Sequence, residues 1–306
     1  MLGGIRKLIW PERKAPPSGA RKLILYLLKI GITLAILWRI SSRIALGKSL
    51  AGIFSLPWQV AALVAAISFI RHAAQYHNWH FALQLNPSYI TDKREILASY
   101  LVALPLRFLI PGGSASFGKI FYLSNSSLMA SLAATAAERA FMTWATWSFA
   151  ALAALYYFTN ISFWLRFAAL LIILILPVIA YLVIKWRFRD PAFATAYRIQ
   201  APRMMIMQIV ASGMAYLQYW LILNAFGVIG FFQNWMRMAL TNFSNSIPIT
   251  VAGLGLRESF AIHFLADAGF SAETAVSATL SLFLIQDVIP AIIGAGVLLK
   301  GKPKAD

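Results

Sequence analysis

Long apolar runs separated by short polar segments divide most of this chain. Helical spans are predicted at residues 23–38, 56–70, 128–158, 165–184, 204–226 and 274–299, and the second span has Leu83 as its alternative end. A bilayer core about 30 Å thick is crossed by roughly 20 residues of helix, and several of these runs reach that length. The pattern therefore predicts an all-α polytopic membrane protein with about six full spans.

Pro and Gly interrupt the two remaining apolar segments, 95–126 and 229–268. The first contains IPGGSASFGK from Ile110, and the second contains IPITVAGLGLRESF from Ile247. Setting Pro111 on Pro248, a shift of 248 − 111 = 137, also places Gly118 on Gly255. Paired interruptions in the two halves of a membrane protein are typical of a transport site. The alternative is a pair of interfacial loops, where Gly and Arg cost little.

Basic residues predict how the chain is oriented, because cationic loops resist translocation. The basic segments are the arm 1–22, residues 71–94, residues 185–203 and the tail 301–306, and we place all of them in the cytoplasm. Segment 95–126 must then begin and end inside, and segment 229–268 must begin and end outside. We therefore expect one transmembrane domain, 23–300, in which the two segments are opposed re-entrant helical hairpins in an inverted-repeat-like arrangement.

Composition supports a membrane protein and excludes most soluble classes. The 306 residues are 60% hydrophobic, with a mean hydropathy of +0.71, and only 12% are charged, against about 25% in soluble domains. A net charge of +17 could suggest a nucleic-acid partner. Most Lys and Arg flank apolar runs instead of forming one basic face, so we expect no nucleic acid. Cysteine is absent, which excludes a disulfide framework and a thiolate metal site.

Charged residues inside the apolar segments are candidate substrate-binding groups, because each costs roughly 2.5–3.5 kcal/mol near the membrane centre. The set comprises four cations and three anions: Arg107, Lys119, Arg139 and Arg257, with Glu138, Glu258 and Asp287. This slight positive excess suits a phosphate-bearing headgroup, since Arg binds phosphate through two hydrogen bonds. Arg257 and Glu258 are sequence neighbours, which do not face each other on a helix, so we expect each to find a partner elsewhere or a ligand. The alternative is a purely structural network of ion pairs.

Two further polar groups have less specific meanings. The run of Thr241, Asn242, Ser244, Asn245 and Ser246 could line a hydrophilic path or lie at the outer surface. The set His72, His77 and His80, with Tyr76 and Trp79, favours an interfacial aromatic belt over a metal site, because no carboxylate or Cys stands near. We expect no metal and no cofactor, and no hydrolase triad or phosphate-binding loop stands out.

The two interrupted motifs, with AAERA at residues 136–140 and the Ala-rich last span, resemble the lysylphosphatidylglycerol synthase transmembrane family. This is the flippase portion of the multiple peptide resistance factor, which also occurs as stand-alone proteins. The resemblance implies an inner-membrane protein that moves or binds a lipid. It also implies a site containing Pro111, Gly113, Gly118, Glu138, Arg139, Pro248, Gly253, Gly255, Arg257 and Glu258. The chain departs from the family pattern at Lys119, where we expect an acidic residue, near Leu123, where a basic residue is missing, and at Gln286, where Arg is frequent.

The function expected is a non-enzymatic lipid translocase for a phosphate-bearing lipid such as an aminoacyl-phospholipid. The alternative is a membrane-embedded transferase, or an accessory subunit of one, with Glu258 or Glu138 as a base. A lipid-linked sugar is an alternative substrate. Expected partners are membrane lipids and a lipid-modifying enzyme, and a homo-oligomer stays open. Both termini are expected in the cytoplasm.

Overall fold

The computed structural model describes residues 52–109, 111–124, 127–187, 191–247 and 255–300. Within these ranges every regular element is a helix and no strand occurs, as the sequence predicts. The predicted basic arm 1–22, the first span 23–38 and the tail 301–306 lie outside the described residues.

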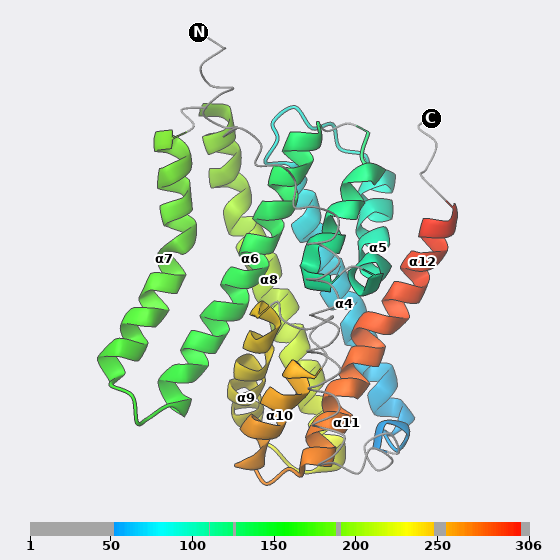
Figure 1. The fold of residues 1–306 in the computed structure, drawn as a ribbon, viewed down its shortest axis with the longest axis vertical. Coiled ribbons are helices and arrows are strands. Elements are labelled where there is room, and N and C mark those ends of the chain that lie inside the picture. The colour runs from blue at the N-terminus through cyan, green and yellow to red at the C-terminus, as the bar shows by residue number, and fades with distance from the viewer. Residues whose placement is uncertain (1–51, 110, 125–126, 188–190, 248–254, 301–306) are drawn as a thin grey trace, which may run out of the picture.

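Long helices running side by side along one axis form the body of the protein (Figure 1). They are α4 (Trp58–Leu83), α6 (Leu128–Tyr157), α7 (Phe163–Arg187), α8 (Pro191–Phe226) and a last composite helix. The composite helix consists of α11 (Ala272–Phe283), a π-helix η3 (Leu284–Val288) and α12 (Ile289–Lys300). Three helices of the described part, Phe163–Arg187, Pro191–Phe226 and Ala272–Lys300, are long and apolar enough to cross a membrane.

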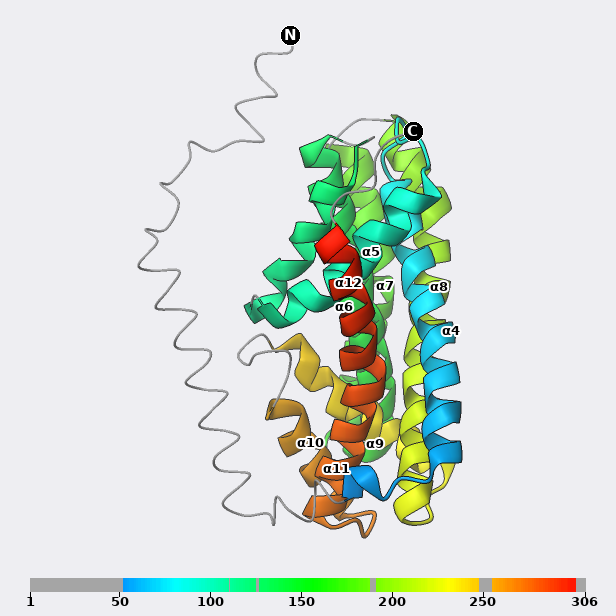
Figure 2. The ribbon, with the colours of Figure 1, turned by 90° about the vertical axis from the view of Figure 1, so that its right-hand side faces the viewer.

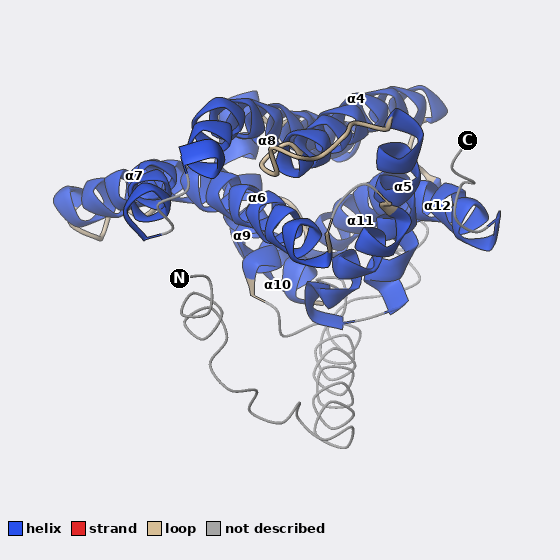
Figure 3. Cartoon of the chain, turned by 90° about the horizontal axis from the view of Figure 1, so that it is seen from above, coloured by secondary structure: helices blue, strands red, loops and turns tan. Residues whose placement is uncertain are grey.

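Helix α4 packs along α8 and against α6, whereas α7 stands at the margin of the bundle (Figure 3). Only Leu170 is buried on α7. An apolar helix with so little protein contact is stable where lipid covers its remaining surface. The arrangement therefore fits a helical membrane protein.

Two helix boundaries change the predicted spans. Helix α4 continues to Leu83, the longer of the two ends considered for this span, so Arg71 lies mid-helix and not at the cytoplasmic end of a span, because Trp79, Ala82 and Leu83 beyond it are buried. Helix α8 begins at Pro191 and not near residue 204. Proline is tolerated in the first helical turn, and Tyr197 and other residues of the early turns pack into the core.

Two pairs of shorter elements occupy opposite halves of the bundle (Figures 1 and 2). The first short pair is α5 (Lys93–Leu109) with the 3₁₀ helix η1 (Pro111–Tyr122). The start of α5 and the segment after η1 are joined by Glu95. Its carboxylate accepts hydrogen bonds from the backbone N–H of Ser124, at 3.0 Å, and from the Ser124 hydroxyl. The α5 backbone also packs closely on α12, where a Cβ added at Gly294 would overlap the Leu101 carbonyl oxygen.

The second short pair is α9 (Phe231–Phe243), continued by the 3₁₀ turn η2 (Ser244–Ser246), with α10 (Leu256–Ala266). Its open end carries an ion pair between Arg237 Nε and Asp267 Oδ1, 3.4 Å apart. At 1.5 Å per residue, α5, α9 and α10 are each about 25 Å long or less, too short to cross a bilayer core of about 30 Å.

The buried apolar side chains form two main clusters, one in each half of the bundle. One includes Trp79 and Ala291, and the other includes Val64 and Leu282. On α4, Arg71 lies between Val64 and Trp79. On the composite helix, Asp287 lies between Leu282 and Ala291. Charged residues therefore sit between the two apolar clusters, near the middle of the long helices.

Candidate functional site

A layer of charged and polar side chains, which we call the mid-depth layer, lies where the two apolar clusters meet, and Tyr100 and Tyr219 belong to both the layer and a cluster. It is defined by Arg71, His72, Tyr100, Arg107, Tyr219, Arg257, Glu258, Gln286 and Asp287. These residues come from α4, α5, α8, α10 and η3. Both short pairs and three long helices, α4, α8 and the composite helix, thus contribute to it.

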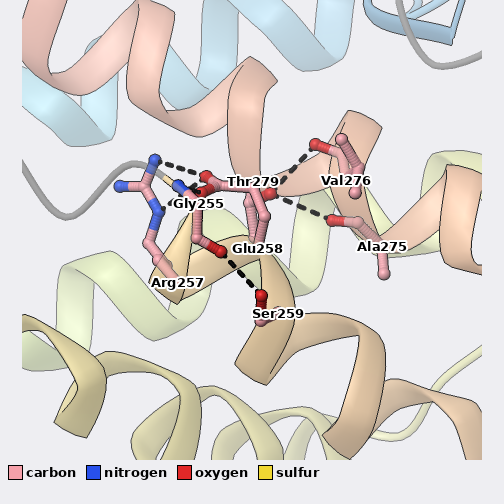
Figure 4. Close-up of polar contacts among 7 residues, drawn as sticks. All are labelled: Gly255, Arg257, Glu258, Ser259, Ala275, Val276 and Thr279. Carbon is pink, nitrogen blue, oxygen red and sulfur yellow. Dashed lines mark hydrogen bonds and ion pairs between the residues drawn. The ribbon is translucent and has the colours of Figure 1, made fainter. Parts of the chain in front are cut away.

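Arg257 and Glu258 bind each other, although the sequence analysis expected partners elsewhere. The Glu258 Oε1 atom accepts hydrogen bonds from Arg257 Nε and Nη2, at 3.3 and 3.1 Å. The Glu258 side chain turns back along the helix, because its Oε2 atom accepts the N–H of Gly255 at 2.6 Å (Figure 4). Glu258 occupies the third helical position, where a carboxylate caps the first backbone N–H of a helix. This capping places the carboxylate beside its neighbour's guanidinium.

Gly255 begins α10 with a φ of 83°, in the left-handed region that favours glycine. This conformation directs its N–H toward Glu258. The Ser259 hydroxyl donates to the Gly255 carbonyl oxygen at 2.9 Å, and the Thr279 hydroxyl bonds back to α11 carbonyls (Figure 4). The start of α10 is therefore held by two side chains of its own first turns, Glu258 and Ser259, which bond to the Gly255 backbone.

The third nitrogen of Arg257, Nη1, points away from Glu258 (Figure 4). No hydrogen bond from this nitrogen is made within the described ranges. The guanidinium also lies over the Phe283 ring, with Cζ 5.1 Å from the ring centroid. Arg257 is thus held by Glu258 and Phe283, and its Nη1 group is directed away from Glu258.

Arg107 and Asp287 connect the first short pair to the last helix. Arg107 Nη1 lies 3.0 Å from Asp287 Oδ1, and Asp287 is buried within the π-helix η3. Short π-helical segments inside α-helices occur frequently at functional sites, because the widened turn redirects side chains and carbonyl groups. Here the widened turn carries both Gln286 and Asp287.

Arg71 and His72 belong to this layer, although the sequence analysis placed Arg71 at a span end and His72 in an aromatic belt. With its amide oxygen turned toward α4, Gln286 accepts from Arg71, 2.8 Å from Nη1. The His72 ring bonds to the Tyr100 hydroxyl at 2.7 Å and to the Gln286 carbonyl oxygen at 2.9 Å. The alternative end of the second span, Leu83, places both residues in the middle of the helix. At Gln286, where the family resemblance leads us to expect Arg, a guanidinium from another helix is present.

A second buried ion pair, between Lys119 and Glu138, lies beside the first short pair. Lys119 is only 2% exposed, and its Nζ lies 3.4 Å from the centroid of the Trp79 ring. The Trp79 indole N–H is held by the Ser99 hydroxyl at 2.8 Å. Arg139 lies over the Phe117 ring, 5.8 Å from its centroid. Lys119 therefore replaces the acidic residue expected here without leaving its charge unpaired.

The remaining candidate residues are Gly118, Pro111, Gly113, Pro248 and Gly253, and the structure describes only some of them. Gly118 lies in η1, where an added Cβ would be 2.5 Å from Leu106 Cδ1. Pro111 and Gly113 also lie in η1, in the stretch whose side chains are not described. Pro248 and Gly253 are outside the described residues.

The polar run at residues 241–246 was expected to line a hydrophilic path or to lie at the outer surface. Thr241 and Ser244 are almost fully buried, so this part of the run faces the interior and not the outer surface. Among the described residues no group of three or more His, Cys, Asp or Glu is suited to hold a metal ion.

Cations exceed anions around these ion pairs. The cations are Arg71, Arg107, Lys119 and Arg257, and the anions are Glu138, Glu258 and Asp287, so four positive charges meet three negative ones. An excess of one positive charge in a partly dry interior favours binding of an anion.

The bundle of apolar helices and its buried charged layer define a multi-pass helical membrane protein. The sequence model of the lysylphosphatidylglycerol synthase TM region matches residues 26–294, which is most of the chain. The protein belongs to this family, whose members are related to lipid modification or transport. Among proteins with curated functions, none matches the chain.

Proposed function

We propose that this protein is a lipid translocase that moves a phosphate-bearing lipid, such as an aminoacyl-phospholipid, between the two leaflets of the inner membrane. The observation that carries the proposal is the excess of one positive charge in the mid-depth layer of a family member. An uncompensated cation at this depth destabilises the protein unless an anion binds it. A lipid phosphate supplies that anion and reaches the site through the membrane.

The two short pairs support movement between leaflets. We interpret α5 with η1, and α9 with α10, as re-entrant hairpins entering from opposite membrane faces, related as an inverted repeat. Their ends carry Arg107 and Arg257, which both interact electrostatically with Asp287. A headgroup at this layer would then be reached from one face past the first pair and from the other face past the second.

The charge distribution supports an orientation with the α5 start and the α7 end in the cytoplasm. That end of the bundle carries Lys93, Arg94, Lys185, Arg187 and Lys300. These five cations outnumber Asp92 and Glu95 at the same end, whereas the opposite end carries equal numbers, Arg166 and Arg237 with Asp267 and Glu273. Cationic loops remain on the cytoplasmic side, so the C-terminal end of α12 is cytoplasmic in this arrangement.

The alternative, a transferase using Glu138 or Glu258 as a base, has less support. Each of these carboxylates already accepts hydrogen bonds from a neighbouring cation, Lys119 or Arg257. An accessory role beside a lipid-modifying enzyme remains compatible with a translocase, since that enzyme would supply the lipid.

The test is a leaflet assay in proteoliposomes. The purified protein is reconstituted with a fluorescent aminoacyl-phospholipid, a fluorescent phospholipid or a fluorescent diacylglycerol, and the fluorophore in the outer leaflet is reduced chemically. We expect the protein to increase the leaflet exchange of a phosphate-bearing lipid relative to Arg257→Lys. Exchange no faster than in protein-free vesicles for every phosphate-bearing lipid would refute the proposal, and a change in lipid mass in the extract would indicate a transferase.

A further inference from the structure

The three arginines of the mid-depth layer are matched by only two carboxylates. Arg107 pairs with Asp287 at 3.0 Å, and Arg257 pairs with Glu258 at 3.1 Å. Arg71 is different, because the group within hydrogen-bond distance of its guanidinium among the described residues is the neutral side-chain amide of Gln286. The Asp287 carboxylate acts on Arg71 electrostatically but is already bonded to Arg107.

Tyr219 on α8 provides a second, independent observation. Its side chain is 1% exposed, and its hydroxyl makes no hydrogen bond within the described part of the chain. Arg71, Arg257, Glu258 and Asp287 lie near enough to act on the hydroxyl electrostatically. A buried hydroxyl without a partner is costly, and such groups normally bind a water molecule or a ligand.

We propose that Arg71 and Tyr219 form the phosphate-binding site of the protein and that its ligand is the phosphate diester of a membrane lipid. The guanidinium of Arg71 would donate two hydrogen bonds to the phosphate oxygens, and the Tyr219 hydroxyl would donate one. Gln286 holds the guanidinium without neutralising it, which keeps the positive charge for the ligand. The identity of the ligand as a lipid rests on the proposed function, whereas the binding site rests on the geometry.

A diester suits this site better than a free phosphate dianion. The net charge of Arg71, Arg107, Arg257, Glu258 and Asp287 is +1, since three cations face two anions. A diester carries one negative charge and neutralises this excess. The acyl chains of its lipid would extend toward the apolar surface of the bundle, where α7 and the composite helix expose large apolar side chains.

Binding can be measured without transport. The purified protein in detergent is titrated with short-chain phosphatidylglycerol, with diacylglycerol of the same chains and with inorganic phosphate, and thermal unfolding reports binding. We expect phosphatidylglycerol to stabilise the wild type and the other two probes to have little effect. Arg71→Gln should weaken the apparent affinity about 10- to 100-fold, and Tyr219→Phe about 2- to 10-fold. Arg71→Lys should retain part of the affinity, because it keeps the charge but not the planar fork.

Two matched controls separate binding from general damage. Arg203→Gln removes an arginine that also lies against a glutamine, 3.4 Å from Gln200, but that is exposed and 16 residues from Tyr219 along α8. Tyr216→Phe removes a buried hydroxyl on the same helix, one that bonds to Asn242. Both should bind phosphatidylglycerol as the wild type does.

The outcomes distinguish this inference from the proposed function. If Arg71→Gln and Tyr219→Phe bind phosphatidylglycerol with wild-type affinity while the wild type exchanges lipid in vesicles, the site assignment is wrong and the translocase stands. If inorganic phosphate binds as tightly as the lipid, the lipid assignment is wrong. Binding by the wild type that is lost in Arg71→Gln, without leaflet exchange, supports the site and refutes the translocase. Should Arg71→Gln fail to fold, Tyr219→Phe decides the question.

Discussion

Arg107 and Asp287 are 180 residues apart in the sequence and form an ion pair of 3.0 Å. The pair joins α5, in the first short pair, to the π-helix of the last long helix. Asp287 also interacts electrostatically with Arg71 and Arg257, so one carboxylate acts on arginines from α4, α5 and α10. A displacement of α5 relative to the last helix would therefore change the charge balance of the whole layer.

Arg257 provides a test of whether a guanidinium is needed beyond its charge. Arg257→Lys keeps one positive charge beside Glu258 but loses the planar fork that binds Glu258 and presents Nη1 elsewhere. We expect this variant to fold normally and to lose lipid exchange by about tenfold or more. Arg257→Ala should also lose about 3–5 kcal/mol of stability, because Glu258 would remain buried without its partner. Lipid exchange at the wild-type rate in Arg257→Lys would make Arg257 a structural residue.

Gly255 can be tested against a glycine with nearly the same positive φ. Gly255 and Gly269 have φ values of 83° and 82°. Replacing either with Ala should cost about 1–2 kcal/mol from the left-handed conformation alone. Only Gly255→Ala should also reduce lipid exchange, because it disturbs the N–H that orients Glu258. Equal loss of exchange in both variants would show that the effect is one of stability, and thermal unfolding of each supplies that comparison.

The Lys119–Glu138 pair predicts strong coupling between two substitutions. Lys119→Met leaves a buried carboxylate unpaired, and Glu138→Gln leaves a buried ammonium unpaired, so each should lose about 3–5 kcal/mol. The double variant removes both charges and should recover most of the loss. Thermal unfolding of the wild type and the three variants completes a double-mutant cycle. Additive losses would contradict a direct interaction between the two side chains.

Gly294 and Gly296 offer a matched pair on α12. A Cβ at Gly294 would overlap the Leu101 carbonyl oxygen and lie 2.7 Å from Pro105 Cδ, whereas a Cβ at Gly296 meets nothing within 4 Å. Gly294→Ala must displace α5 and should lose about 1–3 kcal/mol. Gly296→Ala should be neutral or gain up to about 1 kcal/mol from better helix propensity. Equal unfolding temperatures for the two variants would contradict the close contact between α5 and α12.

The absence of native cysteine allows the orientation to be tested with single cysteines. Ser88→Cys, in the loop before α5, should react with a membrane-impermeant reagent only from the cytoplasm, and Asn160→Cys, between α6 and α7, only from outside. At the short pairs, we expect Ser116→Cys to react from the cytoplasmic side and Ser246→Cys from the outer side. Labelling of both short pairs from one face would refute the inverted-repeat interpretation.

Hydropathy was sufficient to predict the long helices. The predicted spans 128–158, 165–184 and 274–299 correspond to α6, α7 and the composite helix within a few residues at each end. Their boundaries follow local chemistry, such as the Ser127 and Ser271 side chains that cap α6 and α11. Such signals act over three or four residues and can be recognised in one sequence.

The mid-depth layer could be predicted only in part, because its contacts depend on side-chain direction and on distant elements. The charged residues Arg107, Arg257, Glu258 and Asp287 were recognised from their apolar surroundings. Arg71 was missed, since a basic residue near the end of a 15-residue apolar run usually marks the end of a span. The pairing of Arg257 with Glu258 depends on the turn of a single glutamate toward a helix start, which sequence spacing does not reveal.

The π-helix η3 keeps the two halves of the last helix in phase. Leu282 and Asp287 are buried five residues apart, with Phe283 and Gln286 also buried between them, and Ala291 and Gly294 follow after four and three residues. At 100° per residue, a five-residue step in an α-helix would rotate Asp287 about 140° away from Leu282. The widened turn absorbs the surplus residue, so that α11 and α12 present one continuous face to the bundle. Deleting one residue from this turn would preserve that face and remove the bulge at Gln286 and Asp287. The packing of the last helix and the side chains available to a lipid headgroup can therefore change independently in this protein.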